Sequence, residues 1–338
     1  MEESKGTEVK KPRIEVTYQK AKFHRRIFAD LLDLIIFALV WILLFLGVRG
    51  IVMSTSSYKE VSERANKTRL DSGLYRESEG TLITIATYVD NSSSSLSGKE
   101  KADIYRSSID TLISYLSSEV GEEAGNEARN DFYTYCLDQN YNDIPYFVLE
   151  DNNLSFNEDC MATYNDYASV YRNYIDDNAM GLLSRLDSQY LSDTNRISND
   201  LLYIEIPIAT VIGLLLVYYL PGLVFFRRGR CTIGKKAYHI GRVDSSLLNV
   251  SIGRYTAESM ILIFGIFFLS LYTLGIPLII SFSMMAFSKN KQDFPDYMLG
   301  IHEIDTSRNK IYYSKAEAYV EQLDNSKTAV DFTPESRL

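Results

Sequence analysis

The sequence predicts an all-α, polytopic membrane protein with an added polar domain, and three observations support this fold class. Uncharged apolar runs cover residues 34–48, 206–226 and 260–288. A hydrocarbon core about 30 Å thick needs roughly 20 helical residues, so each run can cross it if the first one is extended. Charge is segregated too: residues 54–200 hold 12 basic and 26 acidic residues, and the rest of the chain holds 23 and 18. Within 54–200, apolar residues recur at helical spacing.

Residues 1–22 are predicted to form a cytoplasmic tail, and residues 23–53 the first transmembrane helix. Arg26, Asp30 and Asp33 come directly before its apolar run. Steps of four and seven residues place these charges within an arc of about 60° on a helix. Because charge inside a membrane helix costs free energy, it usually faces other helices or water. These three residues form a charged stripe, which is therefore a candidate functional site.

The distribution of basic residues predicts the topology. The first 26 residues hold eight Lys and Arg, and residues 227–254 hold seven with a single acid. By the positive-inside rule both segments are cytoplasmic, so residues 54–200 are an extracytoplasmic domain of a multi-pass cell-membrane protein. A cleaved signal peptide is the alternative for the first run. Two Asp residues before the run and the lack of a small-residue cleavage site after it disfavour that alternative.

The acidic domain at 54–200 is predicted to be mainly helical. Apolar residues between Ile104 and Val120 recur at spacings of three to five. A second helical stripe consists of aromatic residues, namely Tyr164, Tyr167, Tyr171 and Tyr174. Such a stripe can bind a ligand, but core packing is the more usual role for tyrosines at this spacing. Residues 82–89 and 147–149 fit short strands and helix ends equally well.

Cysteine and histidine usage limits the chemistry of the chain. Cys136 and Cys160 lie in the predicted extracytoplasmic domain, where a disulfide between them is favoured over the alternative of two buried thiols. Cys231 lies on the predicted cytoplasmic side and should stay reduced. The chain has only three histidines and no Cys/His cluster, so no metal site is expected.

The second transmembrane helix is predicted at about 202–226, with a kink at Pro221-Gly222. A basic cytoplasmic loop follows at 227–258. Its cations are predicted to contact anionic lipid heads and are Arg227, Arg228, Arg230, Lys235 and Lys236. The loop lacks the final Ser or Thr of a phosphate-binding loop, so a nucleotide site is not expected.

The third apolar run, at 260–288, allows two interpretations. It is long for one crossing and short for two, and it contains Gly275-Ile276-Pro277. It is either one long kinked span or a hairpin, which gives three or four transmembrane helices. Lys289 and Lys291 directly after the run favour a hairpin. The membrane core then ends near residue 305, and a charged C-terminal tail covers 306–338.

Several motifs lie next to the expected spans, at residues 23–33 (FHRRIFADLLD), 232–236 (TIGKK), 242–244 (RVD), 250–254 (VSIGR) and 291–296 (KQDFPD) followed by Gly300. Together, and in this order, they resemble the RDD family of membrane proteins. The family-like loop contributes Thr232, Gly234, Lys235 and Lys236. The resemblance covers residues 23–53 and 202–305. Residues 54–200 therefore look like a large insertion in the connection between the first two spans.

Two positions depart from the family pattern. Pro295 stands where the family usually has His, and Asp30 stands at a variable position. The charges that match the family signature are Arg26, Asp33 and Asp296. The resemblance implies a link to transport, which in some members includes Na⁺/H⁺ antiport. An ion or proton site at these three charges is one hypothesis, because burial raises the pKa of a carboxylate and a nearby Arg lowers it again. The alternative is a structural clamp in which Arg26 pairs with Asp33 or Asp296.

Two functions follow as hypotheses. The chain is either a cation- or proton-linked transporter or transporter component, or a membrane-anchored sensing, binding or scaffold protein without transport. The expected partner is the lipid bilayer, with a partner chain or self-association left open. No basic nucleic-acid-binding face is visible in the sequence. No catalytic arrangement stands out either, so neither an enzyme nor a cofactor is expected.

Overall fold

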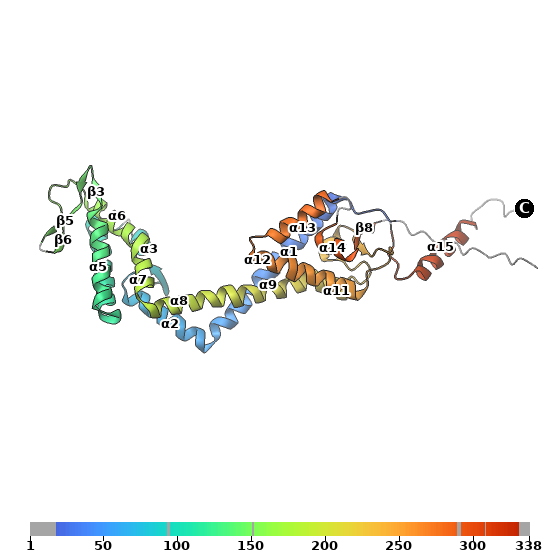
Figure 1. Ribbon diagram of the computed structural model, residues 1–338, viewed down its shortest axis with the longest axis horizontal. Helices are drawn as coiled ribbons and strands as arrows, with labels where there is room; N and C mark the ends of the chain where they lie inside the picture. The colour runs from blue at the N-terminus through green and yellow to red at the C-terminus, as the bar shows by residue number, and fades with distance from the viewer. Residues whose placement is uncertain (1–17, 93–94, 151, 289–291, 308, 331–338) are drawn as a thin grey trace, which may run out of the picture. The chain divides into compact units, whose positions relative to one another are not determined.

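The computed structural model describes residues 18–92, 95–150, 152–288, 292–307 and 309–330. Contacts divide the chain into two compact units. We call Met1–Arg49 with Ile204–Leu338 the membrane unit, and Gly50–Tyr203 the polar unit. Figure 1 shows α1, α9, α11 and α13 in the membrane unit and α2, α3, α5, α6 and α7 in the polar unit.

Three helices of the described residues are long and apolar enough to cross a bilayer, which confirms a mainly helical, multi-pass protein; the short strands described below are the departure from an all-α fold. They are α1 (Phe23–Ser54), a continuous helix at Ser188–Phe225, and a third at Ile252–Tyr272. The second comprises α8 (Ser188–Asn199), η3 (Asp200–Glu205), α9 (Ile206–Leu214), η4 (Leu215–Tyr219) and η5 (Pro221–Phe225). The third comprises α11 (Ile252–Met260), η6 (Ile261–Phe268) and α12 (Leu269–Tyr272).

The last apolar run forms a helical hairpin. After α12 the chain turns at Leu274 and Gly275, which have φ of 52° and 82°. It then forms α13 (Ile276–Phe287), which packs against η6. α13 has 12 residues and is shorter than the roughly 20 that a full crossing needs. Lys289 and Lys291, which favoured a hairpin in the sequence, lie outside the described residues.

A small ribbon and short helices close one end of the membrane unit. β7 (Ile240–Val243) pairs antiparallel with β8 (His302–Asp305), and this pairing sets Arg242 opposite Glu303. The chain before α1 lies beside the ribbon, because the Ala21 N–H donates to the Glu303 carbonyl at 3.2 Å. The helices at this end are α10 (Ile233–Ala237), α14 (Phe294–Leu299) and α15 (Lys315–Val330).

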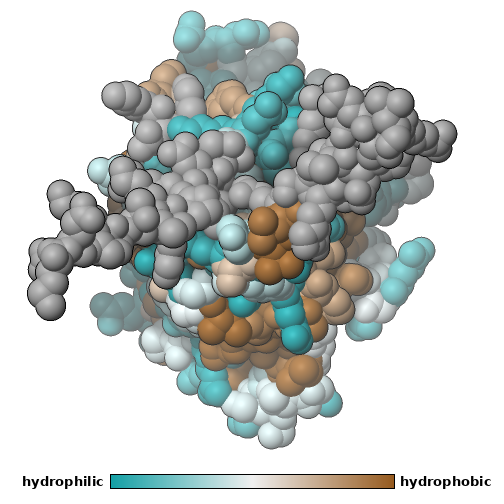
Figure 2. All heavy atoms as spheres, turned by 90° about the vertical axis from the view of Figure 1, so that its right-hand side faces the viewer, coloured by the Kyte–Doolittle hydropathy of each residue, from teal (hydrophilic) through white to brown (hydrophobic). Residues whose placement is uncertain are grey.

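The space-filling view shows that hydrophobic and hydrophilic side chains adjoin on the surface (Figure 2). Large apolar side chains of α1 and α13 are exposed, among them Leu43 and Phe287. An exposed apolar band on a helix suits lipid rather than water.

The polar unit is helical with three short hairpins. Its helices are α2 (Ser56–Asp71), α3 (Ile85–Asn91), α4 (Gly98–Tyr115), η1 (Leu116–Val120), α5 (Glu122–Leu137), α6 (Tyr164–Tyr174), η2 (Ile175–Ala179) and α7 (Met180–Leu186). Its strands are β1 (Tyr75–Ser78), β2 (Thr81–Thr84), β3 (Asn140–Tyr141), β4 (Ile144–Pro145), β5 (Phe147–Glu150) and β6 (Asn153–Phe156). Residues 82–89 are thus a strand end followed by a helix, and 147–149 are a strand.

The aromatic stripe on α6 lies mostly in the core of the polar unit. Tyr167, Tyr171 and Tyr174 are buried and pack against Phe132 and Phe147. Tyr164, by contrast, is 47% exposed. Three of the four tyrosines therefore have the core role that the spacing favours.

The structure corrects the predicted disulfide. Cys136 and Cys160 are both free and buried. Cys136 lies on α5 in the aromatic core, whereas Cys160 follows β6. Burial in this core raises the pKa of Cys136 to about 12.

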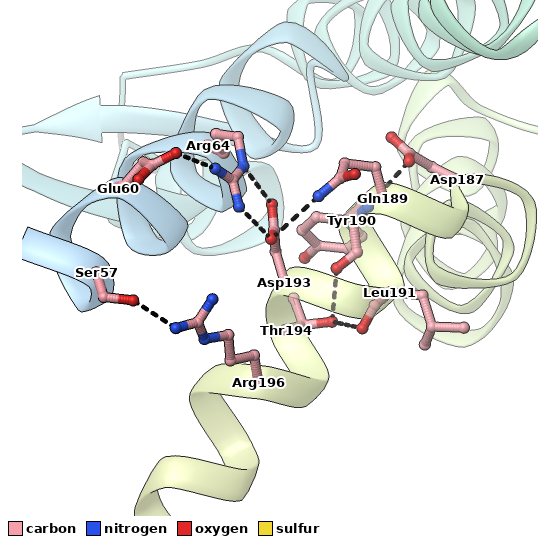
Figure 3. Close-up of polar contacts among 10 residues, drawn as sticks. All are labelled: Ser57, Glu60, Arg64, Asp187, Gln189, Tyr190, Leu191, Asp193, Thr194 and Arg196. Carbon is pink, nitrogen blue, oxygen red and sulfur yellow. Dashed lines mark hydrogen bonds and ion pairs between the residues drawn. The ribbon is translucent and has the colours of Figure 1, made fainter.

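Helices α2 and α8 are held together by a charged contact of the polar unit (Figure 3). Arg64 donates two hydrogen bonds to Asp193, of 3.0 and 2.8 Å, and Gln189 donates a third at 3.2 Å. Asp193 is buried, so this bidentate pair is partly shielded from water and stronger than an exposed one.

Candidate functional site

The centre of the site is a buried carboxylate between two cations. Glu303 of β8 accepts a hydrogen bond from Arg26 of α1, and its other oxygen lies 2.5 Å from Lys235 Nζ of α10. All three side chains are almost fully buried. Arg26 therefore pairs with Glu303, which the sequence analysis did not single out, whereas the clamp hypothesis paired Arg26 with Asp33 or Asp296.

The cations set the ionisation of this centre. Burial alone would raise the pKa of Glu303, but Lys235, Arg26 and Arg242 outweigh it and hold that pKa well below its usual value. Burial and Arg242 would lower the pKa of Lys235, whereas Glu303 and Asp30 raise it above its usual range. The carboxylate and the ammonium are thus both charged.

Asp33 connects α1 to the family-like loop. Its two oxygens accept hydrogen bonds from the Thr232 hydroxyl and from the Gly234 N–H, the latter at 2.7 Å. A Cβ on Gly234 would lie 2.2 Å from the Ala29 carbonyl oxygen, so only glycine fits here. Thr232 also caps α10, since its hydroxyl accepts from the Lys235 N–H. Both carboxylate oxygens of Asp33 therefore hold the loop against α1.

A second buried pair joins the ribbon to the third span. Arg242 of β7 lies 2.5 Å from Glu258 of α11, and both side chains are buried. A buried pair of this kind is costly to break, since loss of one partner leaves an uncompensated charge. Neither Glu258 nor its pairing was predicted.

Asp296 of α14 differs from the other carboxylates of the site. It is 1% exposed, and neither of its oxygens has a hydrogen-bond partner among the described residues. Burial raises its pKa well above the usual value, and the acids Asp293, Glu258 and Glu303 add to this, while Arg242 opposes it. In such surroundings the protonated, neutral form of the carboxyl is favoured over the carboxylate more strongly than in an exposed acid.

Asp30 lies at the edge of the site. Its side chain is 42% exposed and 3.8 Å from Lys235 Nζ. Farther out, Arg25 pairs with Asp305 at 2.5 Å and also donates to the Tyr238 carbonyl. Arg26, Asp30 and Asp33 thus have three different environments although they share one face of α1.

Another polar contact lies at the far end of α1. Arg49 is 3.1 Å from the fully buried Glu205, and Trp41 donates to Thr210 at 2.9 Å. The 16 helical steps from Asp33 to Arg49 span about 24 Å at 1.5 Å each. The two charged sites therefore lie near opposite ends of the apolar length, and neither is at its centre.

The structure also corrects the predicted lipid contacts of the basic loop. Lys235 is 5% exposed and paired with Glu303, and Arg230 is buried and donates to the Val250 carbonyl. Neither can reach a lipid head. Arg227, Arg228 and Lys236 remain exposed, although Arg228 is also 3.0 Å from Glu317.

Comparison with known proteins supports the resemblance read from the motifs. Residues 179–300 match the model of the RDD family. No curated protein and no solved structure matches the chain. The matched segment contains Lys235, Arg242, Glu258 and Asp296, whereas Arg26 and Asp33 precede it. Residues 179–300 are thus an RDD family domain in a multi-pass membrane protein.

Proposed function

We propose that the membrane unit is a proton-linked transporter or transporter component in which Asp296 carries the proton. The observation that supports this most is the burial of both Asp296 oxygens without a partner among the described residues. A carboxyl whose pKa is raised by burial can gain and lose a proton near neutral pH when its surroundings change. Asp33 is less suited to this role, because Thr232 and Gly234 already donate to it.

The charges of the site support the same choice. We define the buried charge cluster as Arg26, Lys235, Arg242, Asp33, Glu258, Asp296 and Glu303, all of which are buried. It contains one more carboxyl than cations. Because an uncompensated buried charge is costly, one bound proton would bring the cluster to neutrality. The residue with the least support as an anion is Asp296, so it is the natural place for that proton.

Proton flux in proteoliposomes tests this proposal. Full-length protein is reconstituted with a pH-sensitive dye inside, and a Na⁺ gradient is imposed. We expect Asp296→Asn to reduce the dye response to that of empty vesicles, because the amide keeps the shape of the protonated acid but cannot exchange a proton. Asp305→Asn is the matched control and should retain the wild-type rate, since Asp305 lies in the outer pair with Arg25. Equal rates in wild type and Asp296→Asn would refute the proposal.

We propose that the buried charge cluster faces the cytoplasm. The basic residues of the N-terminal segment and of the loop at 227–258 support this orientation. Reporter fusions at Asn91 and Arg242 should then report outside and inside. We expect a fusion at Lys310 to report inside as well, because the chain turns back after α12. The opposite pattern would overturn the orientation.

A membrane-anchored binding or scaffold protein is the alternative. The separate core of the polar unit favours it, since a domain with its own core can carry a binding function of its own. If flux is absent in wild type as well, this alternative replaces transport. Retained binding of a partner by an isolated fragment of residues 50–203 would then be its direct support.

A further inference from the structure

The membrane unit contains a cavity of about 290 Å³ between α1, η6 and α13. Most of its lining is apolar and includes Leu31, Leu34, Ile266, Phe267, Phe282 and Met285. One part of the wall is charged and consists of Asp30, Lys235, Arg242 and Asp293. A mostly apolar pocket with a few polar groups is the usual form of a small-molecule site, and the volume is close to the lower limit of about 300 Å³ for such sites.

The cations of this wall are already neutralised. Lys235 Nζ lies 2.5 Å from Glu303, and Arg242 lies 2.5 Å from Glu258. Their charge is therefore committed to buried carboxylates, and an anionic ligand would have to compete with those close pairs. A negatively charged headgroup is disfavoured for this reason.

The carboxylates of the wall are less committed. Asp30 is half-exposed, and its ion pair with Lys235 is long at 3.8 Å. Asp293 accepts the Asp296 N–H on one oxygen, as the cap of α14. Both side chains can accept further hydrogen bonds from a ligand, and a donor that carries positive charge would make the strongest ones.

The apolar walls indicate the other half of the ligand. Leu31, Leu34 and Phe282 line the cavity and are each about half-exposed on the lipid-facing helices, whereas Ile266 and Met285 are buried deeper. An apolar chain could therefore lie against these residues while its head remains at Asp30. Burial of apolar surface contributes about 25 cal/mol per Å², so even a short hydrocarbon chain would be held.

We propose that this cavity binds an amphiphile with a primary ammonium head on a hydrocarbon body, and that Asp30 holds the head. The same chemistry can come from the amine head of a membrane lipid or from a soluble alkylamine. The proposal gives a role to the one charge of the α1 stripe that lies outside the family signature. It concerns binding at equilibrium and does not depend on proton transport.

Native mass spectrometry of the full-length protein in detergent micelles tests the proposal. The probes are phosphatidylethanolamine, phosphatidylcholine, phosphatidylglycerol and dodecylammonium. We expect the wild type to retain phosphatidylethanolamine or dodecylammonium at least tenfold more tightly than the other two lipids, because trimethylammonium cannot donate hydrogen bonds and phosphatidylglycerol lacks positive charge. Selective retention of the lipid alone identifies a lipid source, and retention of the alkylamine alone identifies a soluble one.

Three variants make the test specific. Asp30→Asn should weaken retention at least tenfold, and it should fold normally because Asp30 is half-exposed. Phe282→Trp adds bulk to the apolar wall and should also weaken retention while leaving the charges intact. Asp305→Asn lies outside the cavity and should bind as the wild type does. Equal retention by wild type and Asp30→Asn, preference for phosphatidylglycerol, or no retention of either ammonium probe would overturn the proposal.

Discussion

The residues of the buried charge cluster could be predicted from the sequence only in part. Arg26, Asp33 and Asp296 were identified from the family signature, and all three are buried at one end of the membrane unit. Their partners were not identified. Glu303 meets Arg26 only because β8 pairs with β7 and lies beside the chain before α1. Such a contact between distant segments has no local pattern in the sequence.

Gly234 should be intolerant of any side chain. In Gly234→Ala the new Cβ would lie 2.2 Å from the Ala29 carbonyl oxygen, and backbone cannot move aside cheaply. We expect a loss of about 1–3 kcal/mol in the free energy of unfolding, as is typical of overpacking. Thermal unfolding in detergent measures it.

Gly253→Ala is the matched control for this prediction. It lies in α11, and a Cβ there meets nothing within 4 Å. Alanine is the better helix former, so the melting temperature should stay unchanged or rise. Similar losses in both variants would show that the contact with Ala29 is not the cause.

Asp296 should make the protein less stable as pH rises from about 4. The folded protein keeps the Asp296 proton because its pKa is raised, whereas the unfolded chain loses it near pH 3.9. Above that pH the folded state binds more protons, so stability falls by up to about 1.4 kcal/mol per pH unit until the folded pKa is reached. Asp296→Asn has no proton to lose and should remove this part of the slope.

Melting curves between pH 4.5 and 7.5 measure the effect. Asp305→Asn is the control, since Ser307 and Arg25 lower the pKa of Asp305 to about 2 and this carboxyl stays ionised throughout that window. The difference between wild type and Asp305→Asn should therefore be independent of pH. A constant difference for Asp296→Asn as well would show that Asp296 is ionised in the folded protein.

At the scale of elements, composition predicted the apolar helices well and the irregular parts less well. The three long helices follow from the length of the apolar runs, because a bilayer leaves few other structures possible. The hairpin remained open, since 29 residues fit either interpretation and the turn depends on the positive φ of Leu274 and Gly275. The β7–β8 ribbon was missed, because each strand has only four residues.

Two tyrosines of helix α6, one buried and one exposed, should differ in how much they stabilise the protein. Tyr174 is 1% exposed and packs against Phe132 with ring centroids 4.9 Å apart, while Tyr164 is 47% exposed at the start of the same helix. Tyr174→Ala should cost about 3–5 kcal/mol, as large-to-small changes of buried aromatic residues do. Tyr164→Ala should cost much less, and thermal unfolding of both variants compares them. Equal losses would mean that burial does not explain the stripe.

At the scale of the whole molecule, the charge segregation of the sequence corresponds to two units with separate cores. The sequence placed the domain limits at 54 and 200, and contacts divide the chain at Gly50 and Tyr203. Polar composition alone could not predict the fold of the polar unit, because its hairpins and aromatic core depend on contacts between distant segments.

Two separate cores predict two unfolding transitions in calorimetry of the full-length protein in detergent. The variants already described identify them. Tyr174→Ala weakens the core of the polar unit and should lower one transition temperature, whereas Gly234→Ala disturbs the contact of α1 with α10 and should lower only the other. The double variant should lower both by the sum of the single effects, since distant sites without shared partners are additive. A single transition that both variants lower equally would instead show that the two cores unfold as one cooperative structure.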